Sequence, residues 1–148
     1  MADFEGDAVP LFQEVLDLVD HLILSEDFAL RITRESTAAR AAQALWRADR
    51  AAVIVTCGAE GCWGVSATSG QEAVHYPAFR VQAADTTGCG DVFHGAYAAS
   101  LARGDALPAR IRFATAAAAL KAVAREIPRL RAVNRFLRAE AARGNSRK

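Results

Sequence analysis

Apolar and polar residues follow two different periods along the chain, and these periods predict its helices and strands. Helical spacing predicts helices over residues 10–20, 26–32, 38–46, 88–101, 108–125 and 130–142. The apolar runs His21–Leu24 and Ala51–Val55 are typical of buried parallel strands. Two β-prone runs, 61–67 and 72–76, flank Thr68-Ser69-Gly70-Gln71 and predict a hairpin.

The order of these elements favours an α/β domain whose sheet has an antiparallel edge. Ser36 or Thr37 can cap the helix that begins at Ala38. Only two strands are apolar throughout, and Asp3-Phe4-Glu5 reads like the end of another strand. We therefore expect an incomplete sheet, and a chain that forms a homo-oligomer or associates through the open part of that sheet.

Composition excludes several classes of protein. The chain has 148 residues, of which 52% are hydrophobic and 24% charged, so neither a wholly disordered nor a collagen-like chain is expected. Apolar runs fall well short of the ~20 residues that a membrane span requires. The first seven residues are acidic where a secretory signal would be basic and then apolar. We expect a cytoplasmic protein without a membrane partner.

The net charge of +1 conceals an uneven distribution. Residues 103–148 contain 12 basic and 3 acidic side chains, which is consistent either with phosphate binding or with solvated helix faces. Only Phe113 and Phe136 are aromatic there, so nucleic-acid binding is not expected. The odd number of cysteines argues against a disulfide framework, and the spacing of Cys57 and Cys62 does not fit a zinc knuckle.

The segment Gly88-Cys89-Gly90-Asp91 carries the chemistry, because it stands at the start of a predicted helix. Backbone N–H groups of a first helical turn have no intrahelical partner, and glycines let a phosphate approach them closely. Asp91 would stand beside this anion-binding turn as a proton acceptor, which is the arrangement that phosphoryl transfer needs. A plain helix cap is the alternative interpretation.

The longer string Asp85-Thr86-Thr87-Gly88-Cys89-Gly90-Asp91, followed by Val92 to Ala96, resembles the C-terminal signature of the ribokinase (PfkB-type) carbohydrate kinase family. The resemblance implies that Asp91 is the general base. It also implies that Gly88, Cys89 and Gly90 form the anion hole, with Cys89 contributing its backbone N–H. A redox-active Cys89 thiol of low pKa remains an alternative, because helix N-termini lower thiol pKa values.

Two further segments resemble the family's nucleotide-binding elements. Thr56-Cys57-Gly58-Ala59-Glu60-Gly61 follows a strand, and the resemblance assigns Thr56, Gly58, Ala59 and Gly61 to ATP binding. The small residues of 113–120 resemble the wall of an adenine pocket, with Thr115 and Ala118 as contacts. Close packing of the helix would require the same small residues, so that alternative remains open.

Two departures from the family concern its metal ions. Its Asn-x-x-Glu is replaced by Ser25-Glu26-Asp27-Phe28, where Glu26 is a candidate Mg²⁺ ligand through water or simply part of a helix cap. The loop that would complete a monovalent-cation site is almost absent between Ala124 and Ile127. Asp85 and Thr87 remain candidate ligands of such a cation.

The resemblance implies a ribokinase-like three-layer α/β/α fold. Residues 1–148 would be its C-terminal nucleotide-binding and catalytic portion, without the N-terminal sugar-binding half. The expected function is ATP-dependent phosphotransfer to a hydroxymethyl group of a ribose- or fructose-like sugar, with ATP, Mg²⁺ and a monovalent cation such as K⁺. We expect the isolated chain to be inactive. A nucleoside or vitamin kinase of the same fold, and a non-catalytic remnant that binds nucleotide or a partner, are the alternatives.

Overall fold

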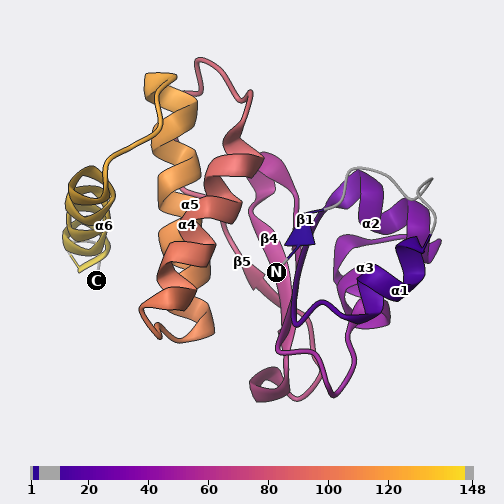
Figure 1. Cartoon of the computed structure of the whole chain (residues 1–148). Coiled ribbons are helices and arrows are strands. Elements are labelled where there is room, and N and C mark those ends of the chain that lie inside the picture. The colour runs from indigo at the N-terminus through magenta and orange to yellow at the C-terminus, as the bar shows by residue number, and fades with distance from the viewer. Residues whose placement is uncertain (1, 4–10, 146–148) are drawn as a thin grey trace. The chain divides into compact units, whose positions relative to one another are not determined.

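The computed structural model describes residues 2–3 and 11–145, which divide between two compact units, residues 1–77 and 78–148. Figure 1 shows the first unit as a sheet with short helices and the second as a group of longer helices. Each unit has its own hydrophobic cluster.

A mixed five-stranded sheet in the order β1-β2-β3-β4-β5 forms the centre of the first unit. β1, β2 and β3 are parallel, whereas β4 runs antiparallel to both β3 and β5. The elements of this unit are β1 Ala2–Asp3, α1 Phe12–Asp17, β2 His21–Ser25, α2 Glu26–Thr33, α3 Ala38–Leu45, β3 Ala52–Thr56, a 3₁₀ turn Gly58–Glu60, β4 Cys62–Ser66, a second 3₁₀ turn Ala67–Ser69 and β5 Val74–Tyr76.

The helices α1, α2 and α3 lie along one face of this sheet (Figure 1). Alternate strand residues point to that face, as the twofold period of a strand requires, so Leu22 and Leu24 of β2 belong to the same cluster as Val53 and Val55 of β3. Small alanines at 38, 41 and 42 are fully or almost fully buried. They let α3 approach the strands closely.

Arg50 is a buried residue that links the loops after α1 and α3. It is only 3% exposed. Its guanidinium donates to the carbonyl oxygens of Leu16 at 2.6 Å, Val19 at 2.9 Å and Leu45 at 2.5 Å. A buried guanidinium needs such acceptors, since an unpaired charge in the interior is costly. Arg50 therefore joins the end of α1 to the end of α3.

Three helices make up the second unit: α4 Cys89–Ala102, α5 Leu107–Ala124 and α6 Leu130–Asn145. α4 and α5 lie side by side along their lengths (Figure 1). α6 packs against α5 through Val133, which is 2% exposed and shares a cluster with Phe113, Ala116 and Ala117. Phe79, ahead of α4, makes an edge-to-face contact with Phe136 of α6 at a centroid distance of 5.0 Å.

These elements confirm the predicted order of helices, parallel strands and hairpin. Thr37, and not Ser36, caps α3 by accepting the N–H of Arg40 at 3.3 Å. The first helix is shorter than predicted and ends at Asp17, whereas the last continues to Asn145. Asp3 belongs to β1, while Phe4, Glu5 and Pro10 lie outside the described residues. Among the helices described, none is both long and apolar enough to cross a membrane.

Candidate active site

The turn that precedes α4 is built around Gly88, the N-cap residue of that helix. Its φ of 71° is left-handed, a conformation that glycine adopts without steric cost. The Cys89 N–H donates to the Thr86 carbonyl at 3.1 Å, and the Val92 N–H donates to the Gly88 carbonyl at 3.1 Å. Within the described part of the chain, the N–H groups of Gly90 and Asp91 have no hydrogen-bond partner.

This pattern differs in one detail from the predicted anion hole. The Cys89 N–H was predicted to face a phosphoryl group, but here it closes the tight turn onto Thr86. The open donors are therefore those of Gly90 and Asp91. A helix N-terminus with open N–H groups and a positive dipole end is suited to an anion such as a phosphate.

Open space surrounds this turn on the side of Gly90. A Cβ placed on Gly90 would meet no heavy atom within 4 Å, whereas one on Gly88 would lie 3.6 Å from Oδ2 of Asp91. The Asp91 carboxylate is exposed, and the short distance from its Oδ2 to the Gly88 position places it beside the turn. It also lines a mostly apolar cavity of about 370 Å³ between α4, α5 and α6. An exposed carboxylate beside open N–H donors can accept a proton next to a bound anion.

Asp85 organises the turn from the other side. Its Oδ1 accepts the N–H of Thr87 at 2.9 Å, and its Oδ2 lies 3.8 Å from Nζ of Lys121 in α5. The backbone N–H of Asp85 donates to the carbonyl of Ala122 at 3.1 Å, which fixes the segment to α5. The hydrogen bonds from Thr87 lower the pKa of the Asp85 carboxyl, and the charge of Lys121 acts in the same direction.

Asp85 and Thr87 are the residues expected to bind a monovalent cation. Both carboxylate oxygens of Asp85 are engaged, one by the Thr87 N–H and the other by the Lys121 ammonium. A second cation in contact with Asp85 would stand close to that ammonium, and like charges at short range repel. Asp85 and Thr87, as arranged here, do not fit a bound monovalent cation.

The thiol of Cys89 is turned toward α5. Sγ lies 3.6 Å from the carbonyl oxygen of Ala118, to which it donates. Burial raises the pKa of the Cys89 thiol, and the nearby charge of Lys121 opposes that rise only in part. A raised pKa gives little thiolate at neutral pH, so the thiol lacks the property that redox cysteines at helix N-termini have.

The two residues predicted for the adenine pocket have different surroundings. Ala118 lies against Cys89 and is therefore adjacent to the turn before α4. Thr115 is buried, and its hydroxyl donates to the Ile111 carbonyl within α5 at 2.8 Å. This hydroxyl is thus already satisfied by the helix, and a role for Thr115 in adenine binding stays a prediction.

The predicted nucleotide-binding loop of the first unit follows β3. The Thr56 hydroxyl donates to the Leu24 carbonyl at 3.3 Å, which anchors it to β2. Gly58 has a φ of 54° and Gly61 a φ of 97° with a ψ of −130°, conformations that glycine adopts far more readily than other residues. Ala59 is exposed between them. Gly58 is also exposed, whereas Gly61 is buried, so the loop is a narrow turn whose residues 58–60 are accessible at the carboxyl end of a strand, the usual place for ligands of α/β sheets.

Glu26 lies in the first turn of α2, at the carboxyl end of β2. Burial, with a further contribution from the nearby Glu26 carboxylate, raises the pKa of the Cys57 thiol to about 11. The cap of α2 is supplied by Ser25, whose Oγ accepts the N–H of Phe28 at 3.4 Å. Glu26 is thus not the capping side chain, and its role toward Mg²⁺ stays a prediction.

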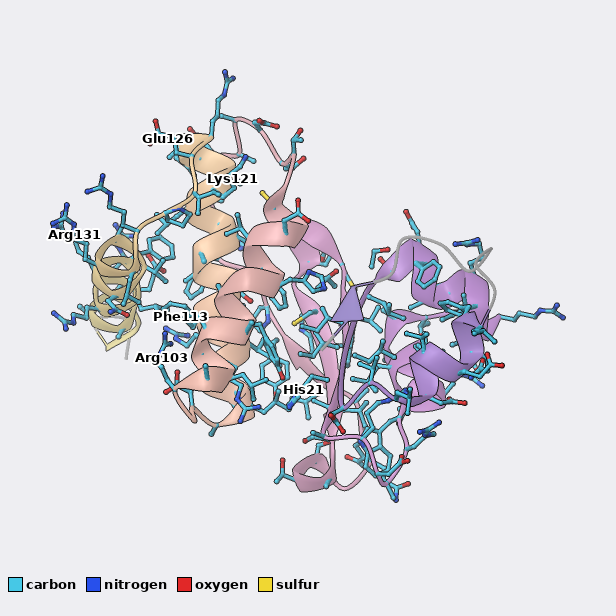
Figure 2. The ribbon with its side chains drawn as sticks, in the orientation of Figure 1. His21, Arg103, Phe113, Lys121, Glu126 and Arg131 are labelled. Atoms are coloured by element: carbon cyan, nitrogen blue, oxygen red, sulfur yellow. The ribbon has the colours of Figure 1, made fainter. Side chains whose placement is uncertain are left out.

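Sequence reasoning missed Lys121. Residues 113–124 contain no other charged side chain, and this isolation within an apolar helix is the signal that was available. Figure 2 shows Lys121 near the C-terminal end of α5, with Phe113 and Arg103 toward the other end. The structure brings Lys121, Asp85, Cys89 and Ala118 together around the turn before α4.

Comparison with known proteins identifies relatives of this arrangement. A family model described as pfkB family carbohydrate kinase matches residues 1–126. The ribokinase of Bacillus subtilis is 39% identical over 113 residues, which cover 76% of this chain and 36% of that protein.

Solved structures show the same fold. Ribokinase from Thermotoga maritima aligns with a TM-score of 0.75 at 31% identity over 85% of this chain and 44% of its own. Arabidopsis thaliana ribokinase, solved with ribose and ATP, aligns with a TM-score of 0.75 at 28% identity over 91% of this chain and 46% of its own. The incomplete ribokinase-like α/β fold expected from the sequence is thus confirmed, and the chain spans less than half the length of these relatives.

Proposed function

The chain belongs to the pfkB family of carbohydrate kinases, and from this premise we propose that it carries the nucleotide-binding and catalytic portion of a sugar kinase. The reaction is transfer of the γ-phosphoryl group of ATP to a hydroxymethyl group of a ribose- or fructose-like sugar. The observation that carries the proposal is the turn before α4, where open N–H groups of Gly90 and Asp91 stand beside an exposed carboxylate.

Asp91 acts as the general base. It accepts the proton of the sugar hydroxyl as the oxygen of that hydroxyl attacks phosphorus, and ADP leaves with the electron pair of the broken P–O bond. The N–H donors at the start of α4, together with the dipole of that helix, stabilise the charge on the phosphoryl oxygens. Gly88 and Cys89 hold the turn in this shape.

Thr56, Gly58, Ala59 and Gly61 contact the phosphates and ribose of the nucleotide; the exposure of Gly58 and Ala59 supports this role, and Gly61 shapes the turn from a buried position. Mg²⁺ accompanies ATP in phosphoryl transfer; when bound, it would be held mainly by the phosphate oxygens, and Glu26 would act on it through water. The solved ATP complex of the Arabidopsis relative supports the use of this nucleotide.

Sugar phosphorylation requires more than this portion. The chain covers 36% of the Bacillus subtilis ribokinase, and its described residues offer no arrangement that we recognise as a grip on sugar hydroxyls. Holding the acceptor in line with phosphorus contributes roughly 7–11 kcal/mol to such reactions. We therefore expect negligible sugar phosphorylation from the 148 residues alone, and activity when they are joined to a sugar-binding half of the family.

The test compares wild-type chain with Asp91→Asn. Calorimetric titration with Mg-ATP should give saturable binding to both proteins, because Asn keeps the size of the side chain and leaves the N–H donors in place. In a fusion of each chain to the N-terminal half of a related ribokinase, Asp91→Asn should lower kcat by about 10²–10⁴-fold, the usual loss for a general base. Absence of ATP binding by the wild-type chain would contradict the proposal, as would a near-normal kcat for the Asp91→Asn fusion.

A further inference from the structure

Lys121 is an unusual residue for its position in α5. It is 8% exposed and lies in a helical stretch made otherwise of small and apolar side chains. Taking an ammonium group out of water is costly unless a charge or hydrogen-bond partner compensates. The group that Lys121 approaches therefore indicates what the side chain does.

That group is the Asp85 carboxylate, whose Oδ2 lies 3.8 Å from Nζ of Lys121. The other oxygen of Asp85 accepts the Thr87 N–H, and the carbonyl of Ala122, the residue after Lys121, accepts the Asp85 N–H. Side-chain and backbone contacts thus connect the same short stretch of α5 to the start of the catalytic turn. The ammonium is also close enough to Cys89, the first residue of α4, to oppose part of the rise that burial causes in the pKa of its thiol.

The Lys121 ammonium has the same single positive charge as K⁺. The sequence assigned Asp85 to a monovalent-cation site, but the carboxylate already has a fixed cation beside it. The connection from α5 to α6 is also short, because α5 ends at Ala124 and α6 begins at Leu130. That leaves few backbone carbonyls to surround a free ion.

We propose that the ammonium of Lys121 takes the place of a bound monovalent cation at Asp85 and holds the turn of residues 85–88 in its anion-binding shape. Lys121 is a positioning residue that acts through Asp85 and does not touch the substrate. The consequence is a nucleotide site that works without K⁺. The part of this inference that concerns nucleotide rests on the proposed function, whereas the part that concerns cation binding does not.

The first measurement needs no nucleotide. Thermal unfolding of the 148-residue chain is followed in K⁺, methylammonium and tetramethylammonium chlorides at equal ionic strength. Wild type and Lys121→Arg should unfold at the same temperature in all three salts. Lys121→Ala removes the charge and leaves space, so K⁺ and methylammonium, but not the bulky tetramethylammonium ion, should stabilise it by mass action. Arg131→Ala removes an exposed charge from α6 and should show no such selectivity.

The second measurement is the Mg-ATP affinity in the same salts. Wild-type affinity should not depend on the cation. Lys121→Ala should bind at least about tenfold more weakly in tetramethylammonium, a difference of about 1.4 kcal/mol, and recover in K⁺ or methylammonium. A merely structural lysine would weaken binding equally in every salt.

Specific stabilisation of the wild-type chain by K⁺ would overturn the inference, and so would a Lys121→Ala protein whose unfolding temperature ignores the identity of the cation. Should Lys121→Ala not fold, the wild-type comparison of K⁺ with tetramethylammonium still decides the matter. A chain that fails to bind ATP in every salt would contradict the proposed function, while the unfolding temperatures would still decide for or against Lys121 as the built-in cation.

Discussion

Replacing Gly90 by alanine should stabilise the chain and weaken its binding of ATP. Gly90 is the second residue of α4, its φ is not left-handed, and a Cβ there would meet no atom of the protein within 4 Å. Glycine in a helix costs roughly 0.5–1 kcal/mol relative to alanine, so the free energy of unfolding should rise by up to that amount. For a protein of this size, 1 kcal/mol corresponds to about 2–4 °C in the unfolding temperature.

The same methyl group should obstruct a phosphate. The N–H groups of Gly90 and Asp91 are open, and the space in front of Gly90 is where an anion would approach them. Losing one hydrogen bond to a charged group costs about 1.5–3 kcal/mol, which corresponds to roughly a 10- to 150-fold weaker affinity. Stability and affinity should thus change in opposite directions.

Gly95 provides the matched control, because it lies in the same helix and its Cβ position is equally open. Gly95→Ala should raise the unfolding temperature without changing the affinity for Mg-ATP. Calorimetric unfolding and titration of the three proteins give both quantities. Equal ATP affinity of wild type and Gly90→Ala would refute the assignment of this turn to phosphate, and a lowered stability would refute the reasoning about open space.

Three further predictions concern the rest of the fold. Arg50→Met should lower the free energy of unfolding, measured by urea titration, by at least about 3 kcal/mol, because it leaves three carbonyls without their donor. The control Arg40→Met, at the surface, should lower it by about 0.5 kcal/mol or less. The pKa of Asp85 is lowered in the folded chain, so the ionised carboxylate stabilises the fold at pH values above its ordinary pKa. This contribution is lost as the pH falls through the lowered pKa. The difference in unfolding temperature between wild type and Asp85→Asn should therefore shrink below about pH 4. The chain should associate at high concentration in light scattering, because among the described residues β1 pairs only with Leu22 and Ile23 and leaves the rest of that β2 edge open; a strictly monomeric species would contradict this.

The parts of the fold that local sequence determines were predictable. Leu22–Leu24 and Ala51–Val55 are apolar without interruption, and both form strands whose centres are completely buried. The turn at Gly88 also followed from local sequence, because its glycines and the helix after it are contiguous. The length of α1 did not, since its end depends on carbonyls that Arg50 binds from more than thirty residues away.

In the candidate site, too, local features were predictable from the sequence and long-range contacts were not. The position of Asp91 beside the glycine turn before α4 was predictable from seven consecutive residues. The pairing of Lys121 with Asp85 was not, because it depends on how α5 packs against the segment before α4. Nor could the sequence indicate that the Cys89 N–H closes the turn onto Thr86, since this depends on the exact backbone angles around Gly88.

Arg50 also has a kinetic consequence. A six-residue helix such as α1 would ordinarily open and close many times before the rest of a domain unfolds, and its amide hydrogens would exchange rapidly with solvent. Opening of α1 here removes the Leu16 carbonyl and disturbs the Val19 carbonyl two residues beyond the helix. The buried guanidinium would then lack acceptors unless the end of α3 opened as well. The amides at the ends of α1 and α3 should therefore exchange as one cooperative unit, far more slowly than the length of either helix suggests.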